Sequence, residues 1–312
     1  MKYFIGNTDI RWYNFLKDRK PEEINFWQPN SHGNFRAILK GAPFLFRIKS
    51  PVDKVGGLAF FSHYTTLPVS MAWDIFEESN GCDSREELNG MLMKYRTDKA
   101  TVNPVIGCII LSDPVFFDEN DWLQLPQDWS KNIVVGKTYS MSEGIGKEYW
   151  KNIEVILKKK QFDKRAYNNE IIIPDRVDDE YSRKYLTKVR TGQGAFRVEV
   201  MDAYSRRCAI TGEKTLPALE ASHIKAYSAK GPNVISNGVF LRSDIHTLFD
   251  EGYITITKEH NIEVSNRIRK EFENGKEYYK YHGNMLQVLP VRDLEKPNKE
   301  FLEWHNKNIY KG

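Results

Sequence analysis

The sequence predicts an α+β protein in which a mixed, β-rich N-terminal domain precedes a C-terminal domain of short strands and helices. Short β-type runs at residues 44–48 (FLFRI), 57–61 (GLAFF) and 105–111 (VIGCIIL) recur between turns that contain glycine or proline. Near residue 187 the pattern changes to a helical segment, two short apolar runs and a helix that begins near Arg242. This change predicts two different folds in one chain.

The length and the composition agree with two domains. A chain of 312 residues with 40% apolar residues can bury a core in each of two ordinary domains. We expect a recognition domain over 1–150, a linker with connecting elements over 151–185, and a third segment, 186–312, that forms the C-terminal domain with its extension. The middle segment is assigned as a linker because it is polar and rich in charge.

Besides the helix that begins near Arg242, three helices are expected from local signals. Residues 69–79 and 84–95 have helical patterns, and Ser84 followed by Glu87 is a capping-box start for the second helix. In the C-terminal domain, residues 195–206 form the expected helix.

Positive charge is unevenly distributed along the chain. The formal net charge is only +4, which is a weak indication of an anionic partner. Basic residues nevertheless outnumber acidic ones in one stretch, which holds Arg183, Lys184, Lys188, Arg190, Arg197, Arg206 and Arg207 against Glu199 and Asp202. Such a stretch suits binding to a phosphate backbone, and it equally suits a solvated helix face.

Cysteine usage and hydropathy restrict the class of protein. Cys82, Cys108 and Cys208 lie far apart and form no CxxC pair, so we expect neither a disulfide framework nor a cysteine zinc cage. No apolar run reaches the about 18 residues of a membrane helix, and the N-terminus lacks the apolar region of a signal peptide. We therefore expect a cytoplasmic protein without membrane contact.

Residues 208–256 carry a set of side chains that suits phosphodiester chemistry. His223 lies in LEASHIK, Asn237 in SNG and His246 in SDIH, with nine positions from Asn237 to His246. This stretch resembles the HNH endonuclease family, in its zinc-free restriction-type branch. The resemblance implies a ββα-metal unit of two short strands and one helix. It implies further that His223 is the general base, that Asn237 braces the backbone and the base, and that His246 ligates a divalent metal.

A second metal ligand follows from helix geometry. His246 and Asp250 are four residues apart on the expected helix, so both side chains leave the same face. An imidazole beside a carboxylate is a plausible site for a divalent ion, and we therefore expect Asp250 to be the second ligand. The alternative is that Asp250 only caps the helix or forms a local ion pair.

The segment departs from the better-known family pattern in two ways. Many relatives have an acidic residue or a histidine before the base, where this chain has Ser222, so water, Glu220 or Asp250 must compensate. Many relatives also have two CxxC pairs around the motif that bind a structural zinc. Here Cys208 stands alone, and Thr211, Arg242 and Ile245 occupy the positions of the other three cysteines. We expect no structural zinc, with apolar packing in its place by Leu219, Ile224, Leu241, Leu248 and Phe249.

The resemblance extends from about Gly192 (GQGAFR) to the tail (EFENGKEYY and EWHN), over more than a third of the chain. It implies an endonuclease that acts on double-stranded DNA with Mg²⁺, Mn²⁺ or Ni²⁺. One HNH centre cuts one strand, so a double-strand break requires a homodimer or two binding events. The basic residues expected to contact DNA are Arg190, Arg197, Arg206, Arg207 and Lys225.

The N-terminal domain weakly resembles PUA-like base readers, which in some modification-dependent restriction enzymes are joined to an HNH nuclease. The resemblance rests on its aromatic-rich β segments, which contain Phe26, Trp27, Phe60, Phe61 and Tyr64. Such domains flip a base between aromatic rings and read its edge with polar groups. Trp27, Tyr64 and Asp113 are candidates for this pocket, and modified cytosine is the candidate base. The alternative is that the rings fill a core.

Two other functions are compatible with the residues. The first is a DNA-binding or regulatory protein with a degenerate, non-cutting HNH fold, which Ser222 at the usual ligand position favours. The second is a hydrolase directed at RNA or nucleotides, because the same chemistry serves either polymer. The resemblance to DNA endonucleases places the second of these last.

Overall fold

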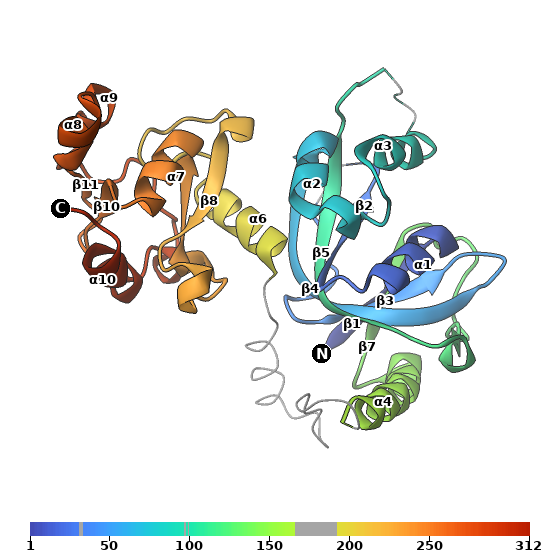
Figure 1. Cartoon of the computed structure of the whole chain (residues 1–312). Helices are drawn as coiled ribbons and strands as arrows, with labels where there is room; N and C mark the ends of the chain where they lie inside the picture. The colour runs from blue at the N-terminus through green and yellow to red at the C-terminus, as the bar shows by residue number, and fades with distance from the viewer. Residues whose placement is uncertain (31–33, 97, 99, 166–191) are drawn as a thin grey trace. The chain divides into compact units, whose positions relative to one another are not determined.

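The computed structural model describes residues 1–30, 34–96, 98, 100–165 and 192–312, and it divides the chain into two compact units. Unit 1 is Met1–Arg190 and unit 2 is Thr191–Gly312 (Figure 1). Unit 1 is a mixed, β-rich domain and unit 2 contains a ββα unit, which confirms the predicted fold class. Within the part of the chain that the structure describes, every helix is too short or too polar to span a membrane.

The framework of unit 1 is a seven-stranded sheet with the order β2-β5-β4-β3-β1-β7, and β6 pairs with β4. β1 and β3 are parallel, and the other neighbours are antiparallel. The strands are β1 Lys2–Thr8, β2 Glu23–Gln28, β3 Pro43–Ile48, β4 Lys54–Pro68, β5 Val105–Phe116, β6 Leu123–Gln124 and β7 Gly136–Ser140. The three predicted β-type runs lie in β3, β4 and β5, whereas β1 was not predicted.

Apolar side chains cover both faces of this sheet. Successive residues of β1 alternate between two cores, with Phe4 in one and Tyr3 and Ile5 in the other, as a pleated strand requires. α1 covers the first core with Trp12, Tyr13 and Leu16, and α4 covers the second with Tyr149, Ile153 and Ile156. The helices of unit 1 are α1 Ile10–Arg19, α2 Val69–Phe76, α3 Arg85–Met93 and α4 Gly144–Arg165.

Local capping signals explain where two of these helices begin. The Asp9 side chain accepts a hydrogen bond from the backbone N–H of Trp12 at the start of α1. The Ser84 hydroxyl accepts one from the backbone N–H of Glu87 at the start of α3, as the capping-box pattern predicts. The predicted helix at 69–79 is shorter than expected, because α2 ends at Phe76 and passes into a 3₁₀ turn, Glu77–Asn80.

The predicted boundary at residue 150 lies inside α4, so the N-terminal domain is longer than expected. Tyr149, Ile153 and Ile156 follow helical spacing and bury their side chains in unit 1. The run of lysines at 158–160 made this region resemble a linker, although Lys158 and Lys159 lie on the exposed face of the helix and the part-buried Lys160 pairs with Asp118. The rest of the predicted linker, from residue 166 to 185, lies outside the described residues.

Unit 2 places two helices on opposite faces of a two-stranded antiparallel sheet. β8 pairs with β9, and His223 stands opposite Gly238. Phe196 of α6 stacks on the ring of His223 on one face, and Glu220 and Ser222 contact α7 on the other. The elements are α6 Gln193–Ala203, β8 Leu219–His223, β9 Gly238–Arg242, α7 Ser243–Asp250, β10 Ile254–Ile256, β11 Ile262–Val264, α8 Arg267–Phe272, α9 Lys276–Tyr279 and α10 Lys299–Asn308.

The C-terminal helix α10 is fixed to the ββα unit by His305. Its ring stacks on Phe249 with centroids 3.9 Å apart, its Nε2 donates to the Phe249 carbonyl at 3.0 Å, and its Nδ1 accepts from the Thr255 hydroxyl at 2.8 Å. Burial lowers the pKa of His305 from 6.5 to about 4, because it disfavours the charged imidazolium. His305 is therefore neutral when α10 is docked.

A fall in pH should weaken the docking of α10, because it protonates His305. Because the folded pKa is below the unfolded one, the unfolded form binds the proton more tightly, and stability is lost as pH falls from 6.5 towards 4. The shift corresponds to on the order of 3 kcal/mol at full titration. Amide hydrogen exchange in α10 should therefore lose protection over this range in the wild type and lose less in His305→Gln. An identical loss in His305→Gln and in a His260→Gln control would contradict this assignment.

Candidate active site

The alternation of β8 separates two groups of polar side chains. Glu220 and Ser222 point towards α7, where they contact His246 and Asp250, and His223 points towards α6. The sheet thus carries an imidazole on one face and a cluster of acids with a second imidazole on the other. The sequence motif alone did not show this division.

The ring of His223 is held by a stacking contact on one face and by a polar contact at Nε2. It stacks on Phe196 with centroids 4.0 Å apart and planes 12° apart. Its Nε2 lies 2.8 Å from Oδ1 of Asn233. Gly238, opposite His223, leaves room for α6, because a Cβ there would lie 2.4 Å from Cγ2 of Val200. We predicted that Asn237 would brace the ring, but the side chain that contacts it is Asn233.

Asn237 instead closes the loop between the two strands. Its fully buried side chain accepts a hydrogen bond from the backbone N–H of Lys225 at 2.9 Å. The same amide donates to the carbonyls of Lys225 and Pro232, both at 3.0 Å. One amide therefore satisfies three backbone groups of the loop, two on Lys225 and one on Pro232.

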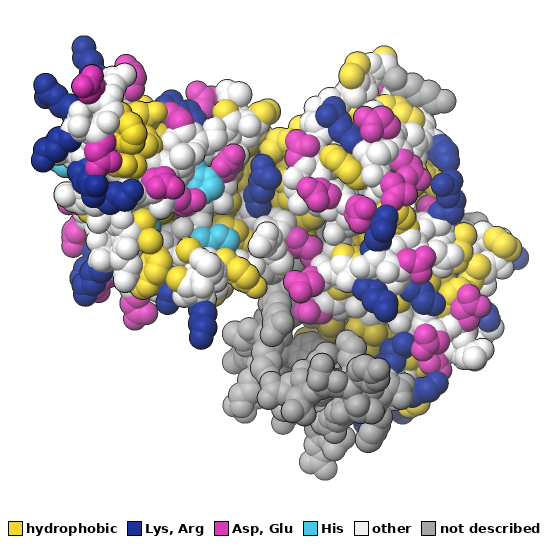
Figure 2. Space-filling model, viewed as in Figure 1, with side chains coloured by type: hydrophobic (Ala, Val, Ile, Leu, Met, Phe, Trp, Pro, Cys, Tyr) yellow, Lys and Arg dark blue, Asp and Glu magenta, His cyan; other side chains and the backbone are white. Residues whose placement is uncertain are grey.

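His246 lies between two carboxylates. Its Nδ1 is 2.5 Å from Oε2 of Glu220, and its Nε2 is 3.1 Å from Oδ2 of Asp250, in the expected i,i+4 arrangement on α7. Burial lowers the pKa of His246, but the hydrogen bonds to Asp250 and Glu220 outweigh burial, so the pKa is raised above its ordinary value. Histidine side chains are visible at the surface of unit 2 with acidic side chains beside them (Figure 2).

This donor set fits a divalent cation with few protein ligands. The two nitrogens of His246 diverge, so the carboxylates of Glu220 and Asp250 lie at opposite edges of the ring. Among the described residues, no three His, Cys, Asp or Glu side chains converge as a closed metal site. Nε2 of His246 and the carboxylate of Asp250 can share one ion whose other ligands are water or phosphate, as Mg²⁺ favours. Ser222 contributes indirectly, because its hydroxyl donates to Oδ1 of Asp250 at 3.2 Å.

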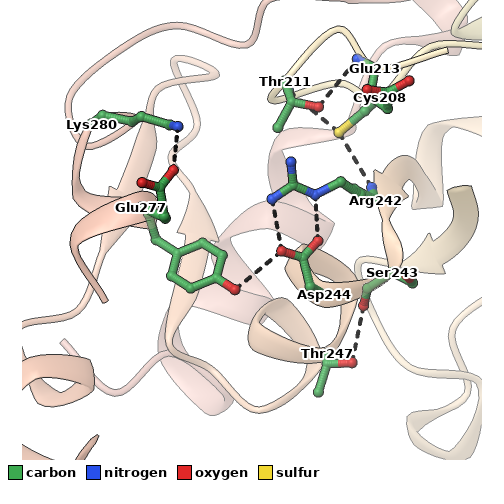
Figure 3. Close-up of polar contacts among 10 residues, drawn as sticks. Cys208, Thr211, Glu213, Arg242, Ser243, Asp244, Thr247, Glu277 and Lys280 are labelled. Carbon is green, nitrogen blue, oxygen red and sulfur yellow. Dashed lines mark hydrogen bonds and ion pairs between the residues drawn. The ribbon is translucent and has the colours of Figure 1, made fainter. Parts of the chain in front are cut away.

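Cys208 lies where the zinc-binding relatives place a ligand. Its buried Sγ accepts hydrogen bonds from the backbone N–H groups of Thr211 at 3.4 Å and Arg242 at 3.3 Å (Figure 3). Beside it, Arg242 forms a bidentate ion pair with Asp244, which also accepts from the Tyr278 hydroxyl. The hydrogen bonds from Arg242 are the main reason that the pKa of Asp244 is lowered. This network connects the end of β9 with α7 and α9.

The basic residues predicted to contact DNA have different environments. Nε of Arg206 pairs with Asp202 at 3.1 Å, and Nε of Arg207 donates to the Gly212 carbonyl at 3.3 Å. Lys225 places its Nζ 5.8 Å from the ring centre of Trp304, beside the candidate centre. Arg197 is half-buried on α6. Arg190, with Arg183, Lys184 and Lys188 of the basic stretch, lies outside the described residues.

The three predicted base-pocket residues do not come together. Trp27 is paired with Cys108, and Tyr64 with Ile109, which places the two rings on opposite faces of the sheet. A bulge between Phe61 and His63 reverses the alternation in β4, so that Tyr64 packs on the same core as Phe61. The single pocket that we expected from Trp27, Tyr64 and Asp113 was therefore wrong.

The candidate residues of unit 1 have structural roles. Trp27 donates its Nε1 hydrogen to the carbonyl of Asn80 at 3.0 Å. Asp113 is exposed, and its backbone N–H donates to the carbonyl of Glu22 at the other end of β2 from Trp27. The aromatic rings largely fill cores, as the alternative interpretation proposed, since Phe26 and Phe61 belong to one core and Phe60 packs against the other.

Residues 208–257 match the model of the HNH endonuclease family. This HNH segment contains β8, β9, α7 and all three motif residues. Among curated proteins, none matches the chain.

Three similar solved structures have low identity to the chain. ASCH from Zymomonas mobilis is 12% identical over 40% of this chain and 75% of that chain, with a TM-score of 0.29. A point mutant of the same Zymomonas mobilis protein is 9% identical over 48% of this chain and 95% of that chain, with a TM-score of 0.32. A structure described as a modification-dependent TagI restriction endonuclease is 14% identical over 88% of this chain and 65% of that chain, with a TM-score of 0.28.

Proposed function

We propose that this protein is a divalent-metal-dependent endonuclease that hydrolyses phosphodiester bonds of double-stranded DNA, as part of restriction or defence. The observation that carries the proposal is the pair of imidazoles around one short sheet within the HNH segment. One is held by Phe196 and Asn233, and the other lies beside Asp250. The first suits proton transfer and the second suits a cation, and phosphodiester hydrolysis needs both.

Each residue has a defined task in this mechanism. His223 takes the proton of the attacking water, and Asn237 keeps the loop beside it closed. Nε2 of His246 and the carboxylate of Asp250 are the groups that would hold Mg²⁺, Mn²⁺ or Ni²⁺, and Glu220 orients the ring of His246 from Nδ1. When bound, the cation supplies positive charge for the phosphate and the leaving oxygen. Lys225 adds positive charge near the base for a phosphate of the backbone.

Replacement of the base should separate cleavage from binding. His223→Ala removes the proton acceptor, so the single-turnover rate of plasmid cleavage should fall by about 10²–10⁴-fold. Affinity for DNA should change little, because that side chain contributes no charge contact to the backbone. His260→Ala, in the same unit, is the matched control and should cut at the wild-type rate. If His223→Ala cuts as fast as the control with the same metal dependence, the assignment of the base is wrong.

The effect of replacing the second metal ligand, Asp250, should be measurable without DNA. Asp250→Asn keeps the shape of the side chain but removes its charge, and Mn²⁺ affinity measured by calorimetry should fall at least about tenfold. Glu251→Gln removes the neighbouring charge and should leave the affinity unchanged. Binding should also weaken as pH falls through the raised pKa of His246, because a proton then competes for the ring.

The same titration separates the two classes of function. A chain that binds DNA but has no measurable affinity for Mg²⁺, Mn²⁺ or Ni²⁺ would be a DNA-binding or regulatory protein rather than an enzyme. Equal affinity in Asp250→Asn and Glu251→Gln would show that the cation binds elsewhere.

We also propose that unit 1 directs cleavage to DNA that contains modified cytosine. The proposal rests on the order of the two units and on the small size of the ββα sheet, which by itself contacts few bases. Matched plasmids with cytosine, methylcytosine or hydroxymethylcytosine should be cut at different rates at equal protein and Mg²⁺ concentration. Equal rates on all three plasmids would contradict it.

Sedimentation of the chain on a cut DNA should show whether a homodimer makes a double-strand break.

A further inference from the structure

Among the residues that the structure describes, His223 makes one side-chain hydrogen bond, and it is to a residue outside the HNH motif. Nε2 of the ring lies 2.8 Å from Oδ1 of Asn233, and the stack on Phe196 keeps the ring plane fixed. Within the described part of the chain, Nδ1 has no hydrogen-bond partner. The ring therefore has one nitrogen that the protein holds and one that is available to a substrate.

The identity of the Asn233 atom that contacts the ring decides which nitrogen of His223 can accept a proton. A neutral imidazole has one N–H donor and one acceptor nitrogen, and a carbonyl oxygen can only accept. With Oδ1 of Asn233 against the ring, Nε2 must carry the hydrogen, and Nδ1 keeps its lone pair. If the amide were flipped, its NH₂ group would donate to Nε2. The ring hydrogen would then be on Nδ1, and Nδ1 could no longer accept a proton.

The position of Asn233 depends on the loop that Asn237 closes. The Asn237 amide binds the carbonyl of Pro232, the residue directly before Asn233, and both backbone groups of Lys225. Gly231 permits this tight path, because a Cβ there would lie 1.8 Å from the carbonyl oxygen of Lys225. The backbone on the N-terminal side of Asn233 is therefore held from two directions.

We propose that Asn233 is a positioning residue that keeps His223 in the Nε2–H tautomer, with Nδ1 as the proton acceptor for the attacking water. Asn237 acts on the base indirectly, because it holds the loop that carries Asn233. This inference rests on the proposed nuclease function for its meaning in catalysis. The contact itself and the tautomer are properties of the metal-free protein and are measurable without cleavage.

Two isosteric variants test the role of the oxygen. Asn233→Asp keeps an acceptor oxygen in the same place, whereas Asn233→Leu has a similar size and no acceptor. Ser236→Ala changes another side chain of the loop and serves as the control. In the full chain with EDTA, ¹H–¹⁵N correlation of ¹⁵N-labelled histidine identifies which ring nitrogen carries the hydrogen, and His223→Ala assigns the signal.

We expect a protected hydrogen on Nε2 of His223 in the wild type, in Asn233→Asp and in Ser236→Ala, and its loss in Asn233→Leu. Cleavage by Asn233→Leu should fall by about 10–100-fold with unchanged Mn²⁺ affinity, while Asn233→Asp should retain most of the rate. Thermal melting of each variant separates this effect from unfolding. A hydrogen on Nδ1 in the wild type, or a wild-type signal and rate in a folded Asn233→Leu, would overturn the proposal. If no DNA is cut, the proposed function fails, while the spectra still decide the role of Asn233.

Discussion

The pairing of β8 with β9 is the constraint on which the centre depends. Its register sets His223 opposite Gly238 and turns Glu220 and Ser222 towards α7. A slip of one residue would exchange these faces, placing His223 on the side of His246 and Asp250, and Glu220 on the side of Phe196. The ladder is short, so its register needs support from outside the strands. The packed helices α6 and α7 and the buried amide of Asn237 supply this support.

The two imidazoles of the centre are held by opposite nitrogens. Asn233 contacts Nε2 of His223, and Glu220 contacts Nδ1 of His246. A neutral amide oxygen orients a base without adding charge beside it, whereas a carboxylate raises the affinity of a ring for a positive ion or a proton. The different partners therefore agree with different tasks for two residues of the same type. His305 is a third case, in which the ring binds a hydroxyl and a backbone carbonyl, and burial lowers its pKa and keeps it neutral.

Hydrogen bonds and apolar packing hold the segment around Cys208 together. Cys208 accepts two backbone hydrogen bonds, and the Arg242–Asp244 pair with Tyr278 connects the end of β9 with α7 and α9. Apolar packing by Leu219, Ile245 and Phe249 contributes in the same region, since all three are buried. The single cysteine of the motif thus has a structural role in the fold.

The sequence by itself determined the motif residues and their order, because His223, Asn237 and His246 occur in a strand–loop–helix pattern with a fixed spacing. It also placed Asp250 beside His246, since an i,i+4 relation is local to one helix. Only the tertiary structure decided which side chain holds the base, because Asn233 meets His223 through a closed loop. It likewise decided against a joint pocket of Trp27 and Tyr64, since a bulge in β4 reverses the alternation that a strand pattern assumes. Contacts within one element follow from spacing, whereas contacts between elements depend on register and loop closure.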